Sequence, residues 1–352
     1  MKGRTYDLLV IGATGFTGHL ACEYLTAWGP PGLKWAAVGR SEAKLANLRG
    51  ELGLSHTLQC DVTDLPRLEQ LIRDASVVAN FAGSPFIDKA LPIVRLCAEH
   101  GTDYVDITGE TPLQRASYDL YHEQAISSGA CIVHQCGYDS IPSDIGAFLA
   151  VGALRDSFGC TAAEIKTFAG KSKGGISGGT LATVLYMLTK ADVPGAADAA
   201  ARGAYALDPA GAKGGPDTAV GSPDLVRYDR RMRTWHAPFV MAAVNAPVVR
   251  KSAVLLGYGD DCRYAEVMAV PSLLAAVGAV AGLALSGAAL LLPPVRALLF
   301  KLGVLPRCHT HTDRIPHPVP YVAISTPSLS PFTPHTAHST PPHPTNPELY
   351  PT

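Results

Sequence analysis

The sequence has almost no excess of charge of either sign. Its 352 residues include 29 Lys and Arg against 30 Asp and Glu, which leaves a formal net charge of −1, and only 17% of the chain is charged. Nucleic-acid binding depends mainly on a basic surface that faces the phosphates. This balance therefore argues against nucleic acid as a partner.

Paired cysteines are also missing. The chain has 8 cysteines, none of them in a C-x-x-C pair, so their spacing predicts no metal site. Most of them lie within apolar stretches, which indicates free, mostly buried thiols in a reducing compartment. Because the first predicted strand begins almost at Met1, we find no signal peptide and expect an intracellular protein.

The strongest motif is a strand, a glycine-rich turn and a helix at the start of the chain. Residues 7–11 form a short apolar run that is typical of a buried parallel strand. Residues 19–28 predict a helix, and its expected apolar face consists of Leu20, Cys22, Tyr24 and Leu25. The glycines between strand and helix are spaced G-x-x-G-x-x-G, which in this context predicts dinucleotide binding.

Each glycine of the motif has its own expected role. Gly12 makes the tight turn, Gly15 lets the backbone approach a pyrophosphate, and Gly18 lets helix and strand pack closely. The first N–H groups of the helix then face the phosphates. We expect the cofactor to contact the whole loop, namely Gly12, Ala13, Thr14, Gly15, Phe16, Thr17 and Gly18.

The second predicted strand, residues 34–38, indicates which dinucleotide binds. NAD enzymes usually have Asp or Glu after this strand for the ribose 2′-hydroxyl, whereas this chain has Arg40 and Ser41. Arg40 can bind a 2′-phosphate through two hydrogen bonds, Ser41 can donate another, and Lys44 lies one helical turn further on. The sequence favours NADP(H) over NAD(H), with a solvated Arg40 on an exposed loop as the alternative.

Two further strand ends complete the predicted cofactor site. The third strand, residues 58–62, carries Asp61 to the place where Rossmann-type domains hold the adenine. Asp61 could equally cap the helix that we predict over residues 64–74. Gly83 follows the fourth strand, residues 76–82, and is expected near the nicotinamide ribose.

Strands and helices keep alternating up to a sixth strand at residues 130–135, which predicts an α/β chain with a parallel, doubly wound sheet. We expect an N-terminal NAD(P)-binding Rossmann fold over residues 1–150 and a second α+β domain, which can be incomplete, over residues 151–270. A hydrophobic segment at 271–306 precedes a Pro- and His-rich tail at 307–352, for which we predict disorder. The histidines of the tail have no fixed ligand spacing, so we predict no metal site.

A reductase also needs a proton donor, and three candidates lie at the predicted sheet edge: His134, Tyr138 and Asp139. Each has an ordinary alternative role, as a strand residue, in packing and as a turn cap, respectively. A helix is predicted over residues 145–154, with Ser143 or Asp144 as its cap. A second glycine-rich loop at 171–180 is expected near substrate or cofactor, and residues 191–221 are expected to be a loop-rich insertion.

Residues 272–292 contain no charged side chain and are nearly all Ala, Val, Leu and Gly. Such a stretch is just long enough to cross a bilayer, but a buried helix or hairpin could have the same composition. Arg296, Lys301 and Arg307 follow it and fit a membrane-surface flank on the cytosolic side. The sequence therefore suggests contact with a membrane or lipid droplet without excluding a buried helix.

Taken with these motifs, the chain resembles the saccharopine dehydrogenase-like oxidoreductase family, whose relatives include the trans-acting enoyl reductases of bacterial glycolipid synthesis. The resemblance covers roughly residues 5–300. It rests on the segments 12–18, 39–41, 101–110, 121–123, 136–144 and 177–180. It implies an NAD(P)-binding Rossmann domain with a smaller α+β domain, and membrane or lipid-droplet association in eukaryotic members.

The chain departs from the family pattern in two places. After the fourth strand the family resembles Gly-Pro-Tyr followed by a Tyr-Gly pair, whereas residues 83–88 are Gly-Ser-Pro-Phe-Ile-Asp. Family members also close the second domain with a glycine-rich segment and a further strand, where this chain has its Pro- and His-rich tail. We therefore expect that the last part of the catalytic domain is missing.

The leading expectation is a reductase that passes hydride from NADPH to a lipid-like or otherwise apolar substrate, with a homodimer as one expected assembly. One alternative is a non-catalytic NADP(H)-binding protein at a membrane or lipid droplet. Another is an atypical short-chain dehydrogenase, because Tyr186 and Lys190 match the Y-x-x-x-K pattern. Saccharopine itself is not expected as substrate, because the second domain shows little clustering of Arg and Lys.

Overall fold

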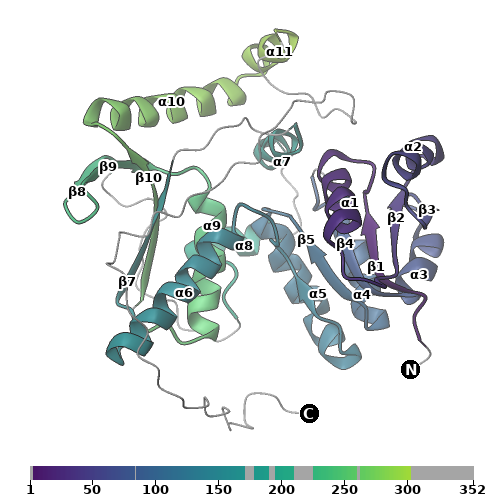
Figure 1. Cartoon of the computed structure of the whole chain (residues 1–352). Coiled ribbons are helices and arrows are strands. Elements are labelled where there is room, and N and C mark those ends of the chain that lie inside the picture. The colour runs from purple at the N-terminus through teal and green to yellow at the C-terminus, as the bar shows by residue number, and fades with distance from the viewer. Residues whose placement is uncertain are drawn as a thin grey trace.

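The computed structural model describes residues 3–83, 85–170, 178–189, 195–209, 225–259 and 262–302. These residues build two β-sheets, each covered by helices (Figure 1). The first sheet belongs to the N-terminal part of the chain and the second to residues beyond 160. The predicted α/β architecture, with a second α+β part, is confirmed.

The first sheet is six-stranded and parallel, in the order β3-β2-β1-β4-β5-β6. The strands are β1 (Tyr6–Ile11), β2 (Trp35–Gly39), β3 (Thr57–Gln59), β4 (Ala75–Asn80), β5 (Asp103–Asp106) and β6 (Ile132–Val133). This is the doubly wound order of dinucleotide-binding folds, in which the strand order reverses between β1 and β4. Strand β6 is shorter than predicted at both ends, and at its C-terminal end the positive φ of 60° at Gln135 interrupts the extended run.

Helices cover both faces of this sheet, because neighbouring residues of β1 point to opposite sides. Leu9 and Ile11 pack on one face against α3 (Leu65–Arg73) and α4 (Ala90–His100). Val10 packs on the other face with Cys22 and Leu45, which belong to α1 (Phe16–Trp28) and α2 (Glu42–Leu52). Helix α5 (Thr111–Ser128) follows β5 and contacts α4.

The apolar face that we predicted for α1 is wrong in part. Leu20 and Tyr24 are 47% and 65% exposed, whereas Gly18, His19 and Cys22 are the buried residues. Because α1 lies close to the strand through Gly18, its inner side has room only for small or flat side chains. The helix also begins at Phe16 rather than at residue 19, since Gly15 is its N-cap.

The capping predictions had mixed outcomes. Ser41 caps α2 as expected, with Leu45 and Leu48 buried beneath the helix. The cap of α3 is Asp64, which accepts a hydrogen bond from Arg67 N at 3.2 Å, so the proposed capping role of Asp61 is wrong. Likewise α6 (Ile141–Phe158) begins after Ser140. The alternatives Ser143 and Asp144 therefore lie inside its first turn, because the helix starts four residues earlier than the apolar pattern indicated.

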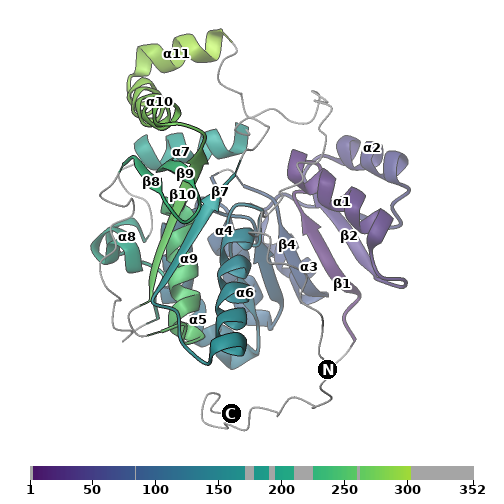
Figure 2. The same cartoon turned by 60° about the vertical axis from the view of Figure 1, so that its left-hand side comes forward.

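The second sheet is mixed and has the order β7-β10-β9-β8. Its strands are β7 (Glu164–Ala169), β8 (Arg227–Asp229), β9 (Thr234–Pro238) and β10 (Arg263–Val270). The neighbours β7 and β10 pair in parallel, whereas β10 with β9 and β9 with β8 pair antiparallel. Helices α6 and α9 (Ala242–Leu255) pack against it through a cluster that includes Val151, Val249 and Tyr264. Figure 2 shows α6 and α9 lying between this sheet and the first one.

Two α-helices in the described residues lie between β7 and β8. Helix α7 (Gly178–Thr189) lies where a helix was predicted, whereas α8 (Ala196–Arg202), followed by a 3₁₀ turn at Gly203–Tyr205, falls in the stretch we expected to be loop-rich. Its run of alanines has high helix propensity, and α8 packs against α5. Residues 171–177 of the predicted second glycine loop, and Lys190, lie outside the described residues.

Helix α10 (Leu273–Leu291) and α11 (Pro293–Lys301) form the far end of the described chain, beyond α7 in both views (Figures 1 and 2). Only Ala276 of α10 is buried, on β9 with its neighbours Ala275 and Ala279. Leu274 and Leu285 are 82% and 72% exposed. The buried-helix alternative for this segment is therefore wrong for the structure described here, and α10 is long and apolar enough to cross a membrane by length and composition.

The cysteines that the structure describes are all free. Cys22, Cys60 and Cys97 are buried, Cys136 and Cys262 are half-buried, and Cys131 and Cys160 are exposed. Only three of these seven thiols are therefore fully buried, fewer than predicted. Cys131 lies in the connection from α5 to β6, and Cys160 lies in the connection from α6 to β7. In both places an apolar stretch of the sequence gives way to a loop.

Candidate functional site

The candidate site lies where the carboxyl ends of β1 and β4 meet. These strands are neighbours, with Ile11 paired to Asn80, and their following loops turn to opposite faces of the sheet. In open α/β sheets such a reversal creates a crevice in which ligands bind. The glycine loop and the loop after β4 form its two sides.

The glycine loop has the shape that a pyrophosphate requires. Gly12 has φ +82°, and a Cβ atom there would lie 2.6 Å from Ala82 N. A Cβ atom on Gly18 would lie 2.2 Å from Gly12 O, so α1 can approach the turn only with glycine at this position. At Gly15, the N-cap of α1, a Cβ atom would lie 3.3 Å from Gly12 O. These three positions form a cradle of bare backbone at a helix N-terminus, which fits a dinucleotide phosphate.

The remaining loop residues divide between packing and exposure. Ala13 is fully buried, and the Thr14 methyl group lies against Gly39, where a Cβ atom would be 3.2 Å away. Phe16 and Thr17 are exposed in the first turn of α1. The glycine loop therefore packs against the end of β2 through Thr14 and Gly39, and its other side faces the crevice.

The end of β2 brings together the residues that we expect at a 2′-phosphate. Arg40 is exposed, Ser41 accepts a hydrogen bond from Lys44 N at 3.4 Å, and the Ser41 hydroxyl hydrogen is left to donate elsewhere. Asp61 follows β3 and accepts hydrogen bonds from Thr63 N and Thr63 Oγ1. These bonds, and less strongly the charge of Arg40, lower the pKa of Asp61. The charged Asp61 carboxylate therefore lies close enough to Arg40 for the two side chains to attract each other.

A buried polar network lies under the ends of β4, β5 and β6. Asn80 Nδ2 donates to Tyr104 Oη at 3.0 Å, and Tyr104 Oη donates to Asp106 Oδ2 at 2.9 Å. His134 Nδ1 lies 2.7 Å from Asp106 Oδ2, and His134 Nε2 lies 2.9 Å from Ser117 Oγ. Both ring nitrogens of His134 are thus engaged within the fold. Desolvation raises the pKa of Tyr104 well above its ordinary value.

Sequence reasoning missed Asn80, Tyr104 and Ser117 as members of this network. Asn80 also accepts a hydrogen bond from Ala82 N at 2.9 Å and so fixes the start of the loop after β4. The available signal was a polar residue at the end of each of three adjacent parallel strands, which places those side chains together at one sheet edge.

The loop after β4 is held by a carboxylate. Gly83 has φ +135°, a conformation that favours glycine. Glu110, which is 2% exposed, accepts hydrogen bonds from Phe86 N and Ile87 N, each at 2.8 Å, and from Thr183 Oγ1 at 3.1 Å. Burial is the largest influence on its pKa and raises it, against the lowering by these three bonds.

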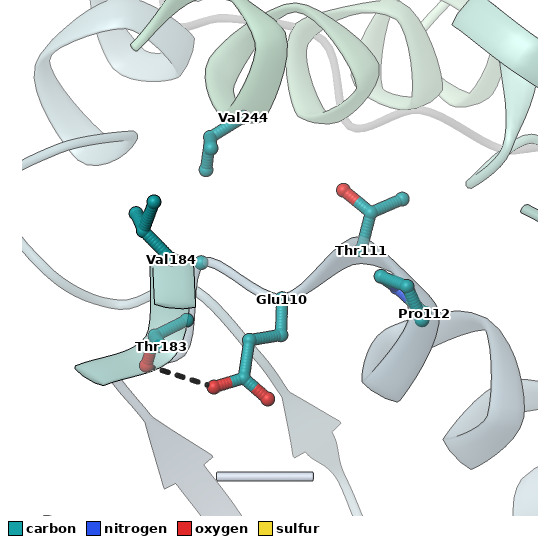
Figure 3. Close-up of a pocket in the computed structure, with 7 residues that line it drawn as sticks. Glu110, Thr111, Pro112, Thr183, Val184 and Val244 are labelled. Carbon is teal, nitrogen blue, oxygen red and sulfur yellow. Dashed lines mark hydrogen bonds between the residues drawn. The ribbon is translucent and has the colours of Figure 1, made fainter. Parts of the chain in front are cut away.

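Beside Glu110 lies a cavity of about 360 Å³ between the β5–α5 turn, α7 and α9. Figure 3 shows Val184 of α7 and Val244 of α9 on its walls, with Glu110 bonded to Thr183. Its lining consists of Gly109, Glu110, Thr111, Pro112, Thr183, Val184 and Val244. The cavity is mainly apolar in its side chains, with the Glu110 carboxylate turned toward the protein rather than into the open space.

The other candidate proton donors lie further along the same edge. Tyr138 is 61% exposed, and Asp139 is an exposed residue whose pKa is raised by partial desolvation. Both precede α6. A second buried carboxylate, Glu266 of β10, lies behind them and accepts hydrogen bonds from Ser143 Oγ at 2.9 Å and Asn245 Nδ2 at 3.1 Å. Glu266 could not be anticipated from the sequence, because no motif surrounds it in β10.

Tyr186, the phenol of the short-chain dehydrogenase alternative, donates a hydrogen bond to Asp88 Oδ1. This bond is the main cause that raises the pKa of Tyr186 to about 12. A tyrosine that acts as acid and base near neutral pH needs the opposite shift.

In the part of the chain that the structure describes, one group of side chains approaches metal-ligand geometry. His19 and Glu23 of α1 and Glu51 of α2 bring ligand atoms within 4.8 Å of one another. His19 Nε2 lies 3.1 Å from Glu23 Oε1, so the cluster also forms an ordinary hydrogen bond between adjacent turns of α1.

Comparisons with known proteins agree with this geometry. A family model of the saccharopine dehydrogenase NADP-binding domain matches residues 8–131. A Mycobacterium tuberculosis protein, provisionally named as a trans-acting enoyl reductase, is 38% identical over 293 residues, which cover 79% of this chain and 69% of that protein. A trans-acting enoyl reductase of Mycobacterium bovis is 35% identical over 303 residues and is covered to 71% of its length, again with 79% of this chain.

Among solved structures, saccharopine dehydrogenase (L-Glu forming) from Saccharomyces cerevisiae is similar at a TM-score of 0.40 and 19% identity, over 47% of this chain and 34% of that one. On the strength of the sequence relatives, the chain belongs to the saccharopine dehydrogenase-like oxidoreductase family and is related to the trans-acting enoyl reductases. Its first sheet is an NADP-binding domain, and the class of protein is an oxidoreductase.

Proposed function

We propose that the chain is an NADP-dependent reductase that acts on an enoyl or keto group of a lipid-like or otherwise apolar substrate. The observation that carries this proposal is an apolar cavity lined in part by Glu110, whose carboxylate also binds Phe86 N in the loop after β4. In a doubly wound sheet we expect that loop at the nicotinamide end of the crevice. NADPH supplies a hydride when it is bound. The names of the relatives, trans-acting enoyl reductases, support the same reaction class.

Within this proposal the chain's own residues have separate tasks. The backbone of Gly12, Gly15 and the first turn of α1 holds the pyrophosphate, and Arg40 with Ser41 selects NADP(H) over NAD(H). Val184 and Val244 exclude water from the acyl part of the substrate. Of the three candidate proton donors, Tyr138 and Asp139 have exposed side chains. Both ring nitrogens of His134 are instead hydrogen-bonded, one to Asp106 and the other to Ser117.

Purified protein tests the proposal in two steps. NADPH and NADH are titrated separately, and NADPH consumption is then followed with a panel of lipid enones and ketones. Val244→Trp places a bulky ring in part of the cavity, so we expect turnover to fall while NADPH affinity stays within about two-fold. Tight NADPH binding without turnover on any substrate would favour the non-catalytic alternative. Loss of turnover in Tyr186→Phe with intact NADPH binding would favour the short-chain dehydrogenase alternative.

We further propose that the protein works at the cytosolic face of a membrane or lipid droplet, through α10. Support comes from its exposed leucines and its packing on β9 through small alanines only. In flotation with phosphatidylcholine vesicles we expect the wild type to rise with the lipid. Leu274→Glu combined with Leu285→Glu should abolish this and leave NADPH binding unchanged. Equal flotation of both proteins would contradict the proposal.

A further inference from the structure

Glu110 makes contacts that its position in the sequence does not explain. Its side chain leaves the β5–α5 turn and meets the peptide N–H groups of Phe86 and Ile87, one on each carboxylate oxygen, both at 2.8 Å. The carboxylate is 2% exposed, and Oε1 accepts a further bond from Thr183 Oγ1 at 3.1 Å. A buried carboxylate that accepts a hydrogen bond from each of two successive peptide groups, and a third from a hydroxyl, holds those groups in a fixed arrangement.

The two N–H groups belong to the turn of residues 85–89, which leads from the end of β4 into α4. Phe86 O accepts bonds from Lys89 N at 2.9 Å and Ala90 N at 2.7 Å, so the turn is continuous with the first turn of α4. Phe86 and Ile87 are 6% and 3% exposed and pack with Ala90 and Leu113. A negative charge at the amino end of α4 is also favoured by the helix dipole.

The same turn is tied to α7. Thr183 bonds to Glu110, and one helical turn later Tyr186 donates a hydrogen bond to Asp88. Tyr186 also packs on the Phe86 and Ile87 cluster. Glu110 therefore stands at the junction of three segments that are far apart in the sequence: the 85–89 turn, the start of α5 and α7.

We propose that Glu110 is a positioning residue: its carboxylate fixes the 85–89 turn, and with it α7, at the nicotinamide end of the cofactor crevice. The statement that the turn faces the nicotinamide rests on the proposed function. The hydrogen bonds by which Glu110 holds the turn do not depend on it. Because the turn belongs to the loop after β4, which forms one side of the crevice, its two anchored peptides set the wall against which the nicotinamide half is held. The adenine half, held by the glycine loop and Arg40, is independent of Glu110.

The test compares Glu110→Gln with the control Glu123→Gln, an exposed position on helix α5, whose N-cap is Glu110. Glutamine keeps one acceptor oxygen but turns an amide donor toward the second N–H group, so one of the two anchors is lost. Hydrogen exchange of the Phe86 and Ile87 amides should accelerate at least ten-fold in Glu110→Gln and stay unchanged in the control. Thr183→Val, which removes only the hydroxyl contact, should give a smaller acceleration and serves if Glu110→Gln does not fold.

Ligand binding supplies the second readout. We expect Glu110→Gln to weaken NADPH at least five-fold while 2′,5′-ADP, which lacks the nicotinamide half, binds within two-fold of wild type. Equal weakening of both ligands would mean a general loss of structure and would overturn the positioning role, as would unchanged exchange at Phe86 and Ile87. If wild-type protein binds no NADPH, the proposed function fails, whereas the exchange result still decides whether Glu110 clamps the turn.

Discussion

Arg40 gives the most direct test of cofactor choice. The side chain is exposed, and among the described residues no hydrogen bond or ion pair of its guanidinium is formed. Arg40→Ala should therefore leave stability within about 0.5 kcal/mol, as expected for an exposed surface residue. Any loss of affinity in the variant can then be assigned to contacts with the ligand.

The size of that loss follows from the chemistry of the contact. A hydrogen bond to a charged group contributes about 1.5–3 kcal/mol, which corresponds to roughly 10- to 150-fold in affinity. Arg40→Ala should weaken NADPH by this factor, whereas NADH, which lacks the 2′-phosphate, should change by less than about three-fold. Removal of Arg40 also leaves the Asp61 carboxylate facing the phosphate site, which adds to the loss for NADPH alone.

Isothermal titration of wild type and Arg40→Ala with each dinucleotide measures the four affinities. At higher salt the difference in NADPH affinity between wild type and Arg40→Ala should become smaller, because the contact between Arg40 and the 2′-phosphate is exposed to solvent and is screened by ions. Arg40→Lys serves as the matched control, because it keeps the charge but loses the two-bond geometry. An equal loss for NADPH and NADH, or no loss for NADPH, would refute the assignment of Arg40 to the 2′-phosphate.

Three further predictions concern the fold around the site. Gly12→Ala should abolish NADPH binding in a titration, because its Cβ atom would lie 2.6 Å from Ala82 N. Tyr104→Phe should lower the free energy of unfolding in urea by about 2–4 kcal/mol, since it leaves the amide of Asn80 and the carboxylate of Asp106 each without one partner. Burial raises the pKa of Glu266, so the folded state holds its proton more tightly than the unfolded state, and stability should fall as pH rises from about 4.3 through the raised pKa. The urea midpoint should therefore depend less on pH across this window in Glu266→Gln than in the wild type. An unchanged pH dependence would contradict the assignment to Glu266.

Much of the nucleotide-binding half could be predicted from the sequence, because its signals are local. Glycine spacing, β-branched runs and a capping serine gave the β1–α1 unit, β2 and the start of α2 close to their observed positions. The parallel sheet order then follows from the alternation of strands and helices, which leaves few topologies.

The rest depends on contacts between distant segments. Glu110 meets Phe86 and Ile87 across 24 and 23 residues, and Ser143 meets Glu266 across 123 residues. No pattern in one sequence encodes such pairs. The exposed side of α1 was mispredicted for a related reason: Leu20 and Tyr24 are apolar, but only the close approach at Gly18 decides which side of the helix faces the strand.

The tight turn at Gly12 also has a consequence for how the gene can vary. What a Cβ atom at residue 12 would strike is the peptide backbone of Phe81 and Ala82, which no change of side chain can move aside. At Gly39 the obstructing atoms are instead side-chain atoms of Thr14 and Leu45, 3.2 Å and 3.3 Å from the Cβ position. A search for second-site suppressors should thus recover compensation for Gly39→Ala, for example Thr14→Ser, and none for Gly12→Ala.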